Sequence, residues 1–149
     1  DEATIKRNHY IEMIAKSEKQ IERDFFSFVK QSVLGKSIKG KVYRPEMRPA
    51  NAKTEDLIVK FLAGLDEQIQ SGVVLLNIYV PDVPFGKDGR KVEDLSRVEA
   101  LETLIQQFID ENDDTEYWMQ TDTSPTSMKI EGIEQHLITA RIKFNRLAQ

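Results

Sequence analysis

Apolar residues recur at the helical period along the first part of the chain. Residues 3–34 contain no Gly or Pro, and their apolar positions form one broad stripe: Ile11, Ile14, Ile21, Phe25, Phe28 and Val29. This pattern predicts a core-packing helix over residues 19–34, stopped by Gly35. The polar stretch 16–20 is where a longer helix would break, so we interpret the residues before it as a mobile or partner-packed extension.

After this glycine the pattern becomes that of strands. Residues 38–43 are typical of a short strand closed by a proline-containing loop. Residues 73–80 are rich in β-branched side chains, apolar on both faces and followed by a proline, so we expect them at the centre of a sheet. Residues 57–62 leave two interpretations open, a buried strand or a helix capped by Thr54.

The second half of the chain alternates between a loop, a helix and strands. Residues 81–91 carry two prolines and two glycines and predict an exposed loop. Residues 96–112 predict a helix, because their apolar positions form a stripe opposite glutamates. Residues 117–121 predict a strand and residues 123–127 a turn. From Ile138 the strict alternation of apolar and polar positions predicts a strand with one buried and one solvent-exposed face.

The order of these elements predicts an α+β fold. We expect a mainly antiparallel sheet of four or five strands with two helices packed on one face, plus an N-terminal helical extension. The extension spans residues 1–18, and a single domain spans residues 19–149.

Composition narrows the classes of function. The chain has 149 residues, no cysteine and a net charge of -4. The absence of cysteine excludes disulfides, thiolate metal sites and a cysteine nucleophile. The negative net charge argues against broad coating of DNA. No apolar run approaches the ~20 residues that span a bilayer, and the first residues do not resemble a signal peptide, so we expect a soluble protein that is not exported.

Two short motifs resemble ligand sites and fail at diagnostic positions. Gly35-Lys36-Ser37 resembles the end of a phosphate-binding loop, but Lys30 stands where that loop needs glycine, and the predicted order is helix to strand. Asp110, Asn112 and Asp114 match the first ligands of a calcium loop, whose sixth and twelfth positions are threonines here. We interpret the acidic run 110–116 as a solvated helix end.

No pattern of catalytic residues is evident. His9 and His136 are far apart in the sequence, and we expect His136 at the surface or rim. Carboxylates occur as adjacent pairs, and neighbours on a strand point to opposite faces. We therefore expect no catalytic, cofactor-binding or metal site, and we expect the protein not to be an enzyme.

Two basic loops are the candidate interface. Residues 44–53 and 83–91 are locally basic in an acidic chain, and the candidate interface residues are Arg44, Arg48, Lys53, Lys87, Arg90 and Lys91. The alternative is that both are ordinary solvated loops. Binding of single-stranded nucleic acid requires aromatic residues interleaved with the basic ones, and only Tyr43 and Phe85 lie near these loops in the sequence.

Five segments carry a resemblance to a known family: 40–44 (GKVYR), 48–51 (RPAN), 55–59 (EDLIV), 68–74 (QIQSGVV) and 77–82 (NIYVPD). The combination resembles the tail terminator or tail completion (minor tail) proteins of tailed phages and prophages of the Bacteroides type. The resemblance covers the chain from about residue 19 onward, and residues 1–18 depart from it.

The resemblance implies a twisted antiparallel sheet with two packed helices, in which residues 57–62 form a strand. It implies a structural protein that forms a ring, usually a hexamer, at the head-proximal end of the tail tube. The implied partners are further copies of the chain and other tail or head–tail proteins, with no membrane and no sequence-specific nucleic acid. The implied location is the host cytoplasm during assembly and then the virion tail.

Such a ring needs two different, complementary patches on each subunit. We expect the basic loops and the sheet edges to form one patch and the acidic run 110–116 to form the other. The alternatives are a small binding module, for nucleic acid for example, and an enzyme whose site is assembled from distant residues.

Overall fold

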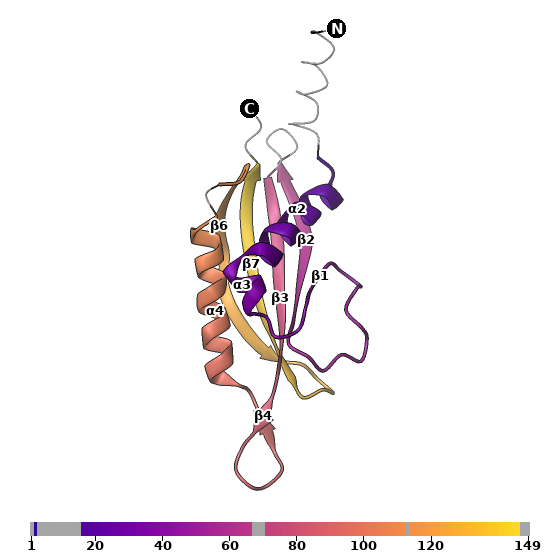
Figure 1. The fold of residues 1–149 in the computed structure, drawn as a ribbon, viewed down its shortest axis with the longest axis vertical. Helices are drawn as coiled ribbons and strands as arrows, with labels where there is room; N and C mark the ends of the chain where they lie inside the picture. The colour runs from indigo at the N-terminus through magenta and orange to yellow at the C-terminus, as the bar shows by residue number, and fades with distance from the viewer. Residues whose placement is uncertain (1, 3–15, 67–70, 113, 147–149) are drawn as a thin grey trace.

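The computed structural model describes residue 2 and residues 16–66, 71–112 and 114–146 (Figure 1). Most of the predicted extension, residues 1–18, therefore lies outside the described residues. The elements are α2 (Glu18–Gln31), α3 (Val33–Ser37), β1 (Val42–Tyr43), β2 (Asp56–Asp66), β3 (Ser71–Pro81), β4 (Val83–Pro84), β5 (Lys91–Val92), α4 (Leu95–Asp110), β6 (Tyr117–Lys129) and β7 (Gln135–Arg146). No helix in the described part of the chain has the length and apolar character needed to cross a bilayer.

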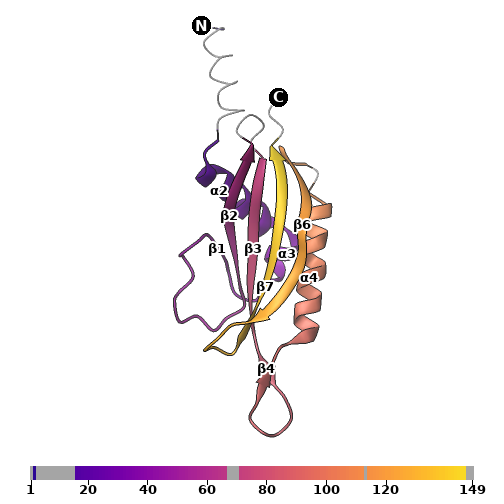
Figure 2. The same cartoon turned by 180° about the vertical axis from the view of Figure 1, so that it is seen from behind.

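The fold is α+β, as predicted. Five strands form one sheet in the order β1-β2-β3-β7-β6, and β4 pairs with β5 in a separate hairpin. All pairings in the large sheet are antiparallel except that of β1 with β2, which is parallel. The helices cover one face of this sheet, and the other face is open (Figures 1 and 2).

The core lies between the sheet and the helices. The strand predicted to be central, β3, is the third of the five, and Leu76 is fully buried. On the helix-facing side Val74 pairs with Ile142 and Leu76 with Ala140. Phe25 of α2 packs against Tyr117 of β6 and Phe144 of β7, with ring centroids 4.9 and 5.2 Å away. This aromatic cluster fixes α2 across the sheet.

The first helix begins where the polar stretch predicts a break and ends earlier than predicted. Ser17 caps α2 in a capping box with Gln20. At the other end the Ser32 hydroxyl donates to the Val29 carbonyl and accepts from the Gly35 N–H. Ser32 thereby caps the start of a separate helix, α3. Gly35 is therefore not a helix stop. A Cβ there would lie 2.0 Å from the Val29 carbonyl oxygen, so only glycine fits.

The ambiguous run 57–62 lies in β2 and is a strand. Leu57 and Val59 face the helices and are fully buried, pairing with Ile78 and Leu76 of β3. Thr54 does not cap a helix; its hydroxyl donates to the Asp56 carboxylate at 2.6 Å. Pairing with the central strand decides between two conformations that the local sequence fits equally well.

The strand β1 is shorter than predicted from residues 38–43. The backbone N–H groups of Lys39 and Lys41 donate to the carboxylates of Glu55 and Asp56 at 2.8 and 2.9 Å. Between them the Gly40 N–H donates to the Glu55 carbonyl at 2.8 Å, and only Val42 and Tyr43 pair with β2 as a strand.

The turn predicted at residues 123–127 is wrong, because β6 continues to Lys129. The strand carries two register shifts, between Thr121 and Thr123 and between Thr123 and Thr126, and Pro125 lies in the second. β6 is an edge strand, where a proline breaks no ladder between strands. The predicted loop 81–91 contains the β4–β5 hairpin, which projects from the body (Figure 1).

Candidate assembly interface

Basic side chains are concentrated in the segment that forms α2, α3 and β1. Residues 16–53 contain ten Lys or Arg and four Asp or Glu, a net charge of +6 in a chain whose total is -4. This segment includes β1 at one sheet edge and α2, which packs on β2 and β1 and crosses the helix-covered face as far as Tyr117 of β6. We call it the basic edge.

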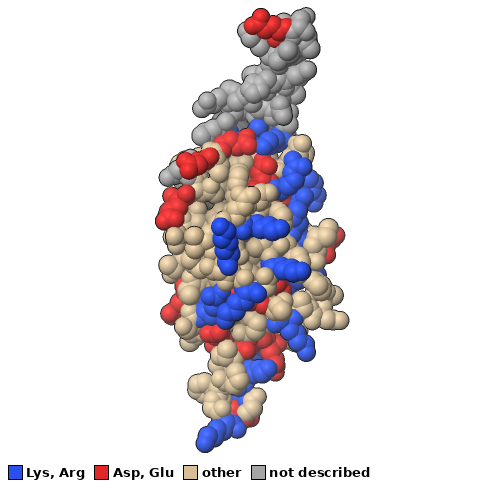
Figure 3. Space-filling model, viewed as in Figure 1, with Lys and Arg blue, Asp and Glu red and all other residues tan. Residues whose placement is uncertain are grey.

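Acidic side chains are concentrated at the opposite edge. Residues 93–122, which include α4 and the start of β6, contain ten Asp or Glu and one Arg, a net charge of -9. α4 packs on β6 and β7, and β6 is the outermost strand on that side. We call this the acidic edge. Figure 3 shows Lys and Arg gathered over α2, α3 and the β1 side, and Asp and Glu along the α4 border.

Many of the charges on the basic edge are available to a partner. Within the described part of the chain, these exposed bases form no ion pair: Lys19, Arg23, Lys30, Lys36 and Lys41. The Lys30 ammonium lies over the Phe26 ring, 5.6 Å from its centroid. An anionic partner could approach these groups without breaking an ion pair that the structure describes.

The negative charges of the acidic edge have few positive charges beside them within their own segment. Burial raises the pKa of Glu102, and the negative charges of Glu93 and Glu99 raise that pKa further. Asp110 and Asp114 are exposed as expected. Glu116 departs from that expectation: it is about one-third exposed and binds Lys16 at 2.8 Å and Arg146 at 2.7 Å. A cation from outside the subunit would relieve repulsion along α4.

Two of the predicted interface residues hold their own loop in place. Arg44 binds the buried Glu22 carboxylate at 3.0 Å and also donates to the Lys19 carbonyl. The Arg48 side chain is only 9% exposed and binds Asp56 at 2.9 Å. Its guanidinium lies 3.9 Å from the centroid of the Tyr79 ring. Both guanidinium groups are thus engaged within the subunit.

The other four predicted interface residues are exposed. Lys53 and Lys87 form no ion pair in the described residues. Arg90 lies over Phe85 at 4.8 Å and 3.5 Å from Asp88. Lys91 binds Glu134 at 3.0 Å.

The two loops share a neighbour at the start of β7. Arg48 and the Ala52 carbonyl contact the Gln135 side chain, while Lys91 contacts the adjacent Glu134. Both loops therefore lie at the same end of the sheet. Sequence reasoning singled them out and missed the larger basic edge on α2 and α3, which a charge count per segment would have found.

The buried ion pairs are structural clamps. Arg97 of α4 binds Glu55 through two nitrogens at 2.7 and 2.8 Å and donates to the Ser37 carbonyl. Burial would raise the pKa of Glu55, but the hydrogen bonds from Arg97 and the Lys39 N–H outweigh it and lower that pKa. The clamp joins α4 to β2 and to the end of α3.

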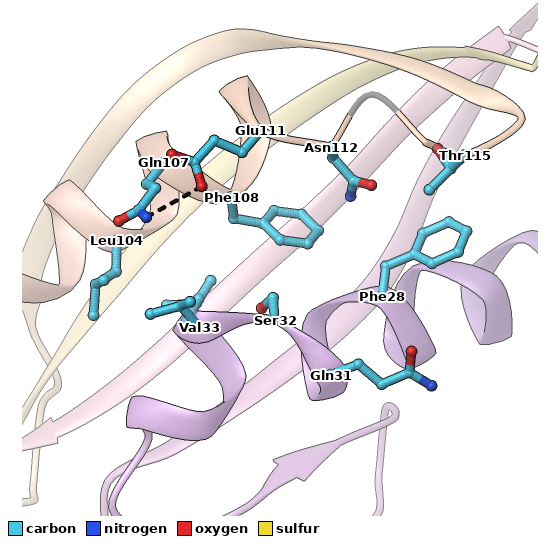
Figure 4. Close-up of a pocket in the computed structure, with 11 residues that line it drawn as sticks. Phe28, Gln31, Ser32, Val33, Leu104, Gln107, Phe108, Glu111, Asn112 and Thr115 are labelled. Atoms are coloured by element: carbon cyan, nitrogen blue, oxygen red, sulfur yellow. Dashed lines mark hydrogen bonds between the residues drawn. The ribbon is translucent and has the colours of Figure 1, made fainter.

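The groove between α2, α3 and α4 has few groups suited to catalysis (Figure 4). Its volume is about 330 Å³, and Phe28, Leu104 and Phe108 form part of its wall. Glu111 is the one ionisable side chain among its lining residues, and it accepts from Gln107 at 3.2 Å. The Ser32 hydroxyl at the groove is engaged with backbone groups.

His136 and the carboxylates do not converge on a metal site. His136 is partly buried, with 16% of its side chain exposed, and its Nδ1 lies 2.6 Å from Asp82. Within the residues that the structure describes, no three His, Asp or Glu side chains are grouped as metal ligands. No protein-family model matches the sequence, and no curated protein matches it either.

Proposed function

We propose that this chain is a structural assembly protein of a phage or prophage tail, whose copies associate head to tail into a ring at the head-proximal end of the tail tube. The observation that carries the proposal is the segregation of charge, with a net +6 segment on one edge of the sheet and a net -9 segment on the other. A ring requires two different patches that are complementary and cannot satisfy each other within one subunit. The two edges are opposite in charge, and Lys16 with Glu116 is the ion pair that the described residues form between them within the subunit, so most of their charges are left for a neighbouring copy.

The tail assignment comes from the sequence resemblance, and the charged edges support the mode of association. In this proposal the protein assembles in the host cytoplasm and ends in the virion tail, with further copies of itself and other tail or head–tail proteins as partners. The exposed loop residues Lys53 and Lys87 are then candidate contacts to a neighbouring tail protein.

Charge complementarity of this kind mainly sets partner choice, register and association rate. Exposed ion pairs each contribute only ~0–1 kcal/mol. The proposal therefore predicts association that is fast at low salt and slows as salt screens the edges, with a Debye length of ~10 Å at 0.1 M.

The test is the mass of the protein in solution over a range of concentrations, at low and at high salt, with and without purified tail tubes. We expect a single ring-sized species, formed in solution or on tube ends, whose formation slows at high salt. A protein that stays monomeric at every concentration and does not bind tube ends would contradict the proposal.

A second candidate function is binding of nucleic acid through the basic edge, which the five unpaired bases favour. Such binding would be strongly salt-dependent. The edge has little of the aromatic platform that single-stranded nucleic acid stacks on, since Phe26 is partly buried beneath Lys30. Micromolar affinity for single-stranded DNA at physiological salt, combined with a monomeric mass, would favour this second function.

A further inference from the structure

Two leucines are turned out to solvent by irregularities in β2. The register with β3 shifts between Phe61 and Ala63 and again between Gly64 and Asp66, so Leu62 and Leu65 have no partner on β3. Their side chains are 40% and 56% exposed. A β-bulge changes the direction of a side chain, and bulges are over-represented at sheet edges and next to functional sites. Two such shifts lie within six residues, and each leaves a leucine exposed to water. An apolar partner would remove both side chains from water.

The outer edge of β2 is open at these leucines. β1 pairs only with Leu57 and Ile58, and the Glu22 carboxylate accepts the Phe61 N–H at 3.0 Å. Beyond Phe61, none of the strands that the structure describes pairs with this edge. The hydrogen bond from Phe61 places the first turns of α2, with Lys19 and Arg23, beside the same stretch.

The opposite edge strand exposes the one tryptophan of the chain. Trp118 lies on β6 between Tyr117 and Met119, which are buried against the helices, and its own side chain faces away and is 51% exposed. It follows directly on the acidic run that contains Asp110 and Asp114.

Trp118 and the exposed leucines lie at the same height on opposite edges of the sheet. The register runs from Trp118 to Asn145 on β7, to Ser71 on β3 and to Asp66 on β2, next to Leu65. Figure 2 shows these strands side by side, and the row lies where β6 begins and β7 ends. Copies in a closed ring are related by rotation without a shift along the axis. The arrangement proposed below has the strands along the ring axis, which brings Trp118 of one copy to the level of Leu65 of the next.

We infer that Trp118 of one copy packs against Leu62 and Leu65 on the free β2 edge of the adjacent copy, as the apolar centre of the ring contact. The inference rests on the proposed function and names the contact that the charged edges surround. Lys19 and Arg23 lie within three residues of Glu22, whose carboxylate accepts the Phe61 N–H next to Leu62, and Asp110 and Asp114 precede the tryptophan. A buried aromatic anchor ringed by polar contacts is the usual source of affinity in an interface, and tryptophan is enriched there.

Trp118 is also a built-in probe, because no other tryptophan contributes to fluorescence. The test follows the emission wavelength and the access of a neutral quencher while the solution mass of the full chain is measured across concentrations or on tail-tube ends. We expect the emission to shift to shorter wavelength and quenching to decrease as the ring forms.

Substitutions then locate the contact. Trp118→Ala, and Leu62→Ser combined with Leu65→Ser, should each weaken association by about 30-fold or more, the size typical of a central anchor. Met128→Ala is the matched control, because Met128 is 61% exposed at the other end of β6, and it should change association by less than about 2-fold. Circular dichroism checks that each variant is folded.

The outcomes separate this inference from the proposed function. Two results would overturn the contact without contradicting the ring: assembly with unchanged Trp118 emission, or a Trp118→Ala variant that associates as strongly as the parent. A chain that associates neither in solution nor on tail-tube ends would overturn both.

Discussion

The Phe61 backbone N–H of β2 donates a hydrogen bond of 3.0 Å to the carboxylate of Glu22 on α2. The same carboxylate binds Arg44 at 3.0 Å and is almost fully buried. One side chain therefore closes part of a strand edge and ties α2 to the loop after β1. It sets where the open portion of the β2 edge begins, and so where the exposed leucines start.

Removing this carboxylate should destabilise the fold. We expect Glu22→Ala to lower the free energy of unfolding by about 2–3 kcal/mol, because a buried N–H loses its acceptor and Arg44 loses its partner. Glu22→Gln should cost less, since its amide oxygen can still accept from Phe61. Urea unfolding of the two variants measures the difference, and equal stability of Glu22→Ala and the parent would disprove the edge-closing role.

Arg48 should matter for stability much more than its loop neighbour Lys53. Arg48→Ala leaves the buried Asp56 without its guanidinium partner and removes the stacking on Tyr79, so we expect a loss of about 3 kcal/mol. Lys53→Ala removes an exposed side chain and should change stability by less than about 0.5 kcal/mol. Thermal or urea unfolding of the pair provides the comparison, and similar losses would show that Arg48 does not clamp the loop.

Stability should fall in acid through Glu55 and Asp56. Burial alone would raise both pKa values, but hydrogen bonds from Arg97 to Glu55 and from Thr54 to Asp56 outweigh it, so both lie below their ordinary values of 4.5 and 3.8. Carboxylates with lowered pKa values contribute stability that is present above their ordinary values and lost as the pH falls below them. We expect unfolding free energy to be flat near neutral pH and to drop below about pH 4.5.

The control for this acid dependence is Glu55→Gln, which cannot lose a proton at that position. Its stability should be lower at pH 7 and should fall less between pH 5 and pH 3 than that of the parent. Parallel pH profiles for the two proteins would rule out Glu55 as a source of the acid sensitivity.

Tyr117 should give a separate loss of stability in alkali. Burial raises the pKa of Tyr117, and the hydrogen bond that its hydroxyl donates to Asp24 at 2.7 Å raises that pKa further. An acid whose pKa is raised by folding contributes stability that is lost as the pH rises above its ordinary value of 10.0. Tyr117→Phe should cost about 1 kcal/mol at neutral pH. It should also remove part of the decline above pH 10, which urea unfolding at pH 9 and pH 11 detects; an undiminished decline would exclude Tyr117 as its source.

The elements predicted well are those whose pattern is set by burial alone. β3 buries Val74, Leu76 and Ile78 toward the helices and keeps Leu75 and Tyr79 half-buried on the open face, and α4 and β7 bury one stripe or one face each. The core residues of these elements, such as Leu76 and Ile138, could be identified because the hydrophobic period does not depend on what the element pairs with.

The departures arise where contacts between distant residues override the local signal. The sequence predicts a turn at Pro125, because an edge strand that tolerates proline cannot be distinguished by its residues alone. It predicts a helix stop at Gly35, whereas the Ser32 hydroxyl begins a second helix three residues earlier. For the same reason, the sequence alone does not show that Arg48 of the candidate interface binds Asp56, because the fold brings these two residues together.

The charged edges can be tested by reversing each one in turn. The basic-edge variant reverses five bases and takes that edge from +6 to -4: Lys19→Glu, Arg23→Glu, Lys30→Glu, Lys36→Glu and Lys41→Glu. The acidic-edge variant reverses five acids and takes that edge from -9 to +1: Glu99→Lys, Asp110→Lys, Glu111→Lys, Asp114→Lys and Asp122→Lys. All ten positions are exposed, so the fold should persist. A control variant carries Lys129→Glu and Lys143→Glu, which lie on β6 and β7 outside the basic edge.

The most direct measurement is the solution mass of each edge variant alone and of the two mixed in equal amounts. Alone, each variant presents like charges on both edges and should not form rings, while the control variant should. In the mixture every contact of an alternating ring pairs opposite charges, so we expect ring-sized assemblies that contain both variants. Rings formed by either edge variant alone, or a mixture that stays monomeric while the parent protein assembles, would contradict assembly through the charged edges.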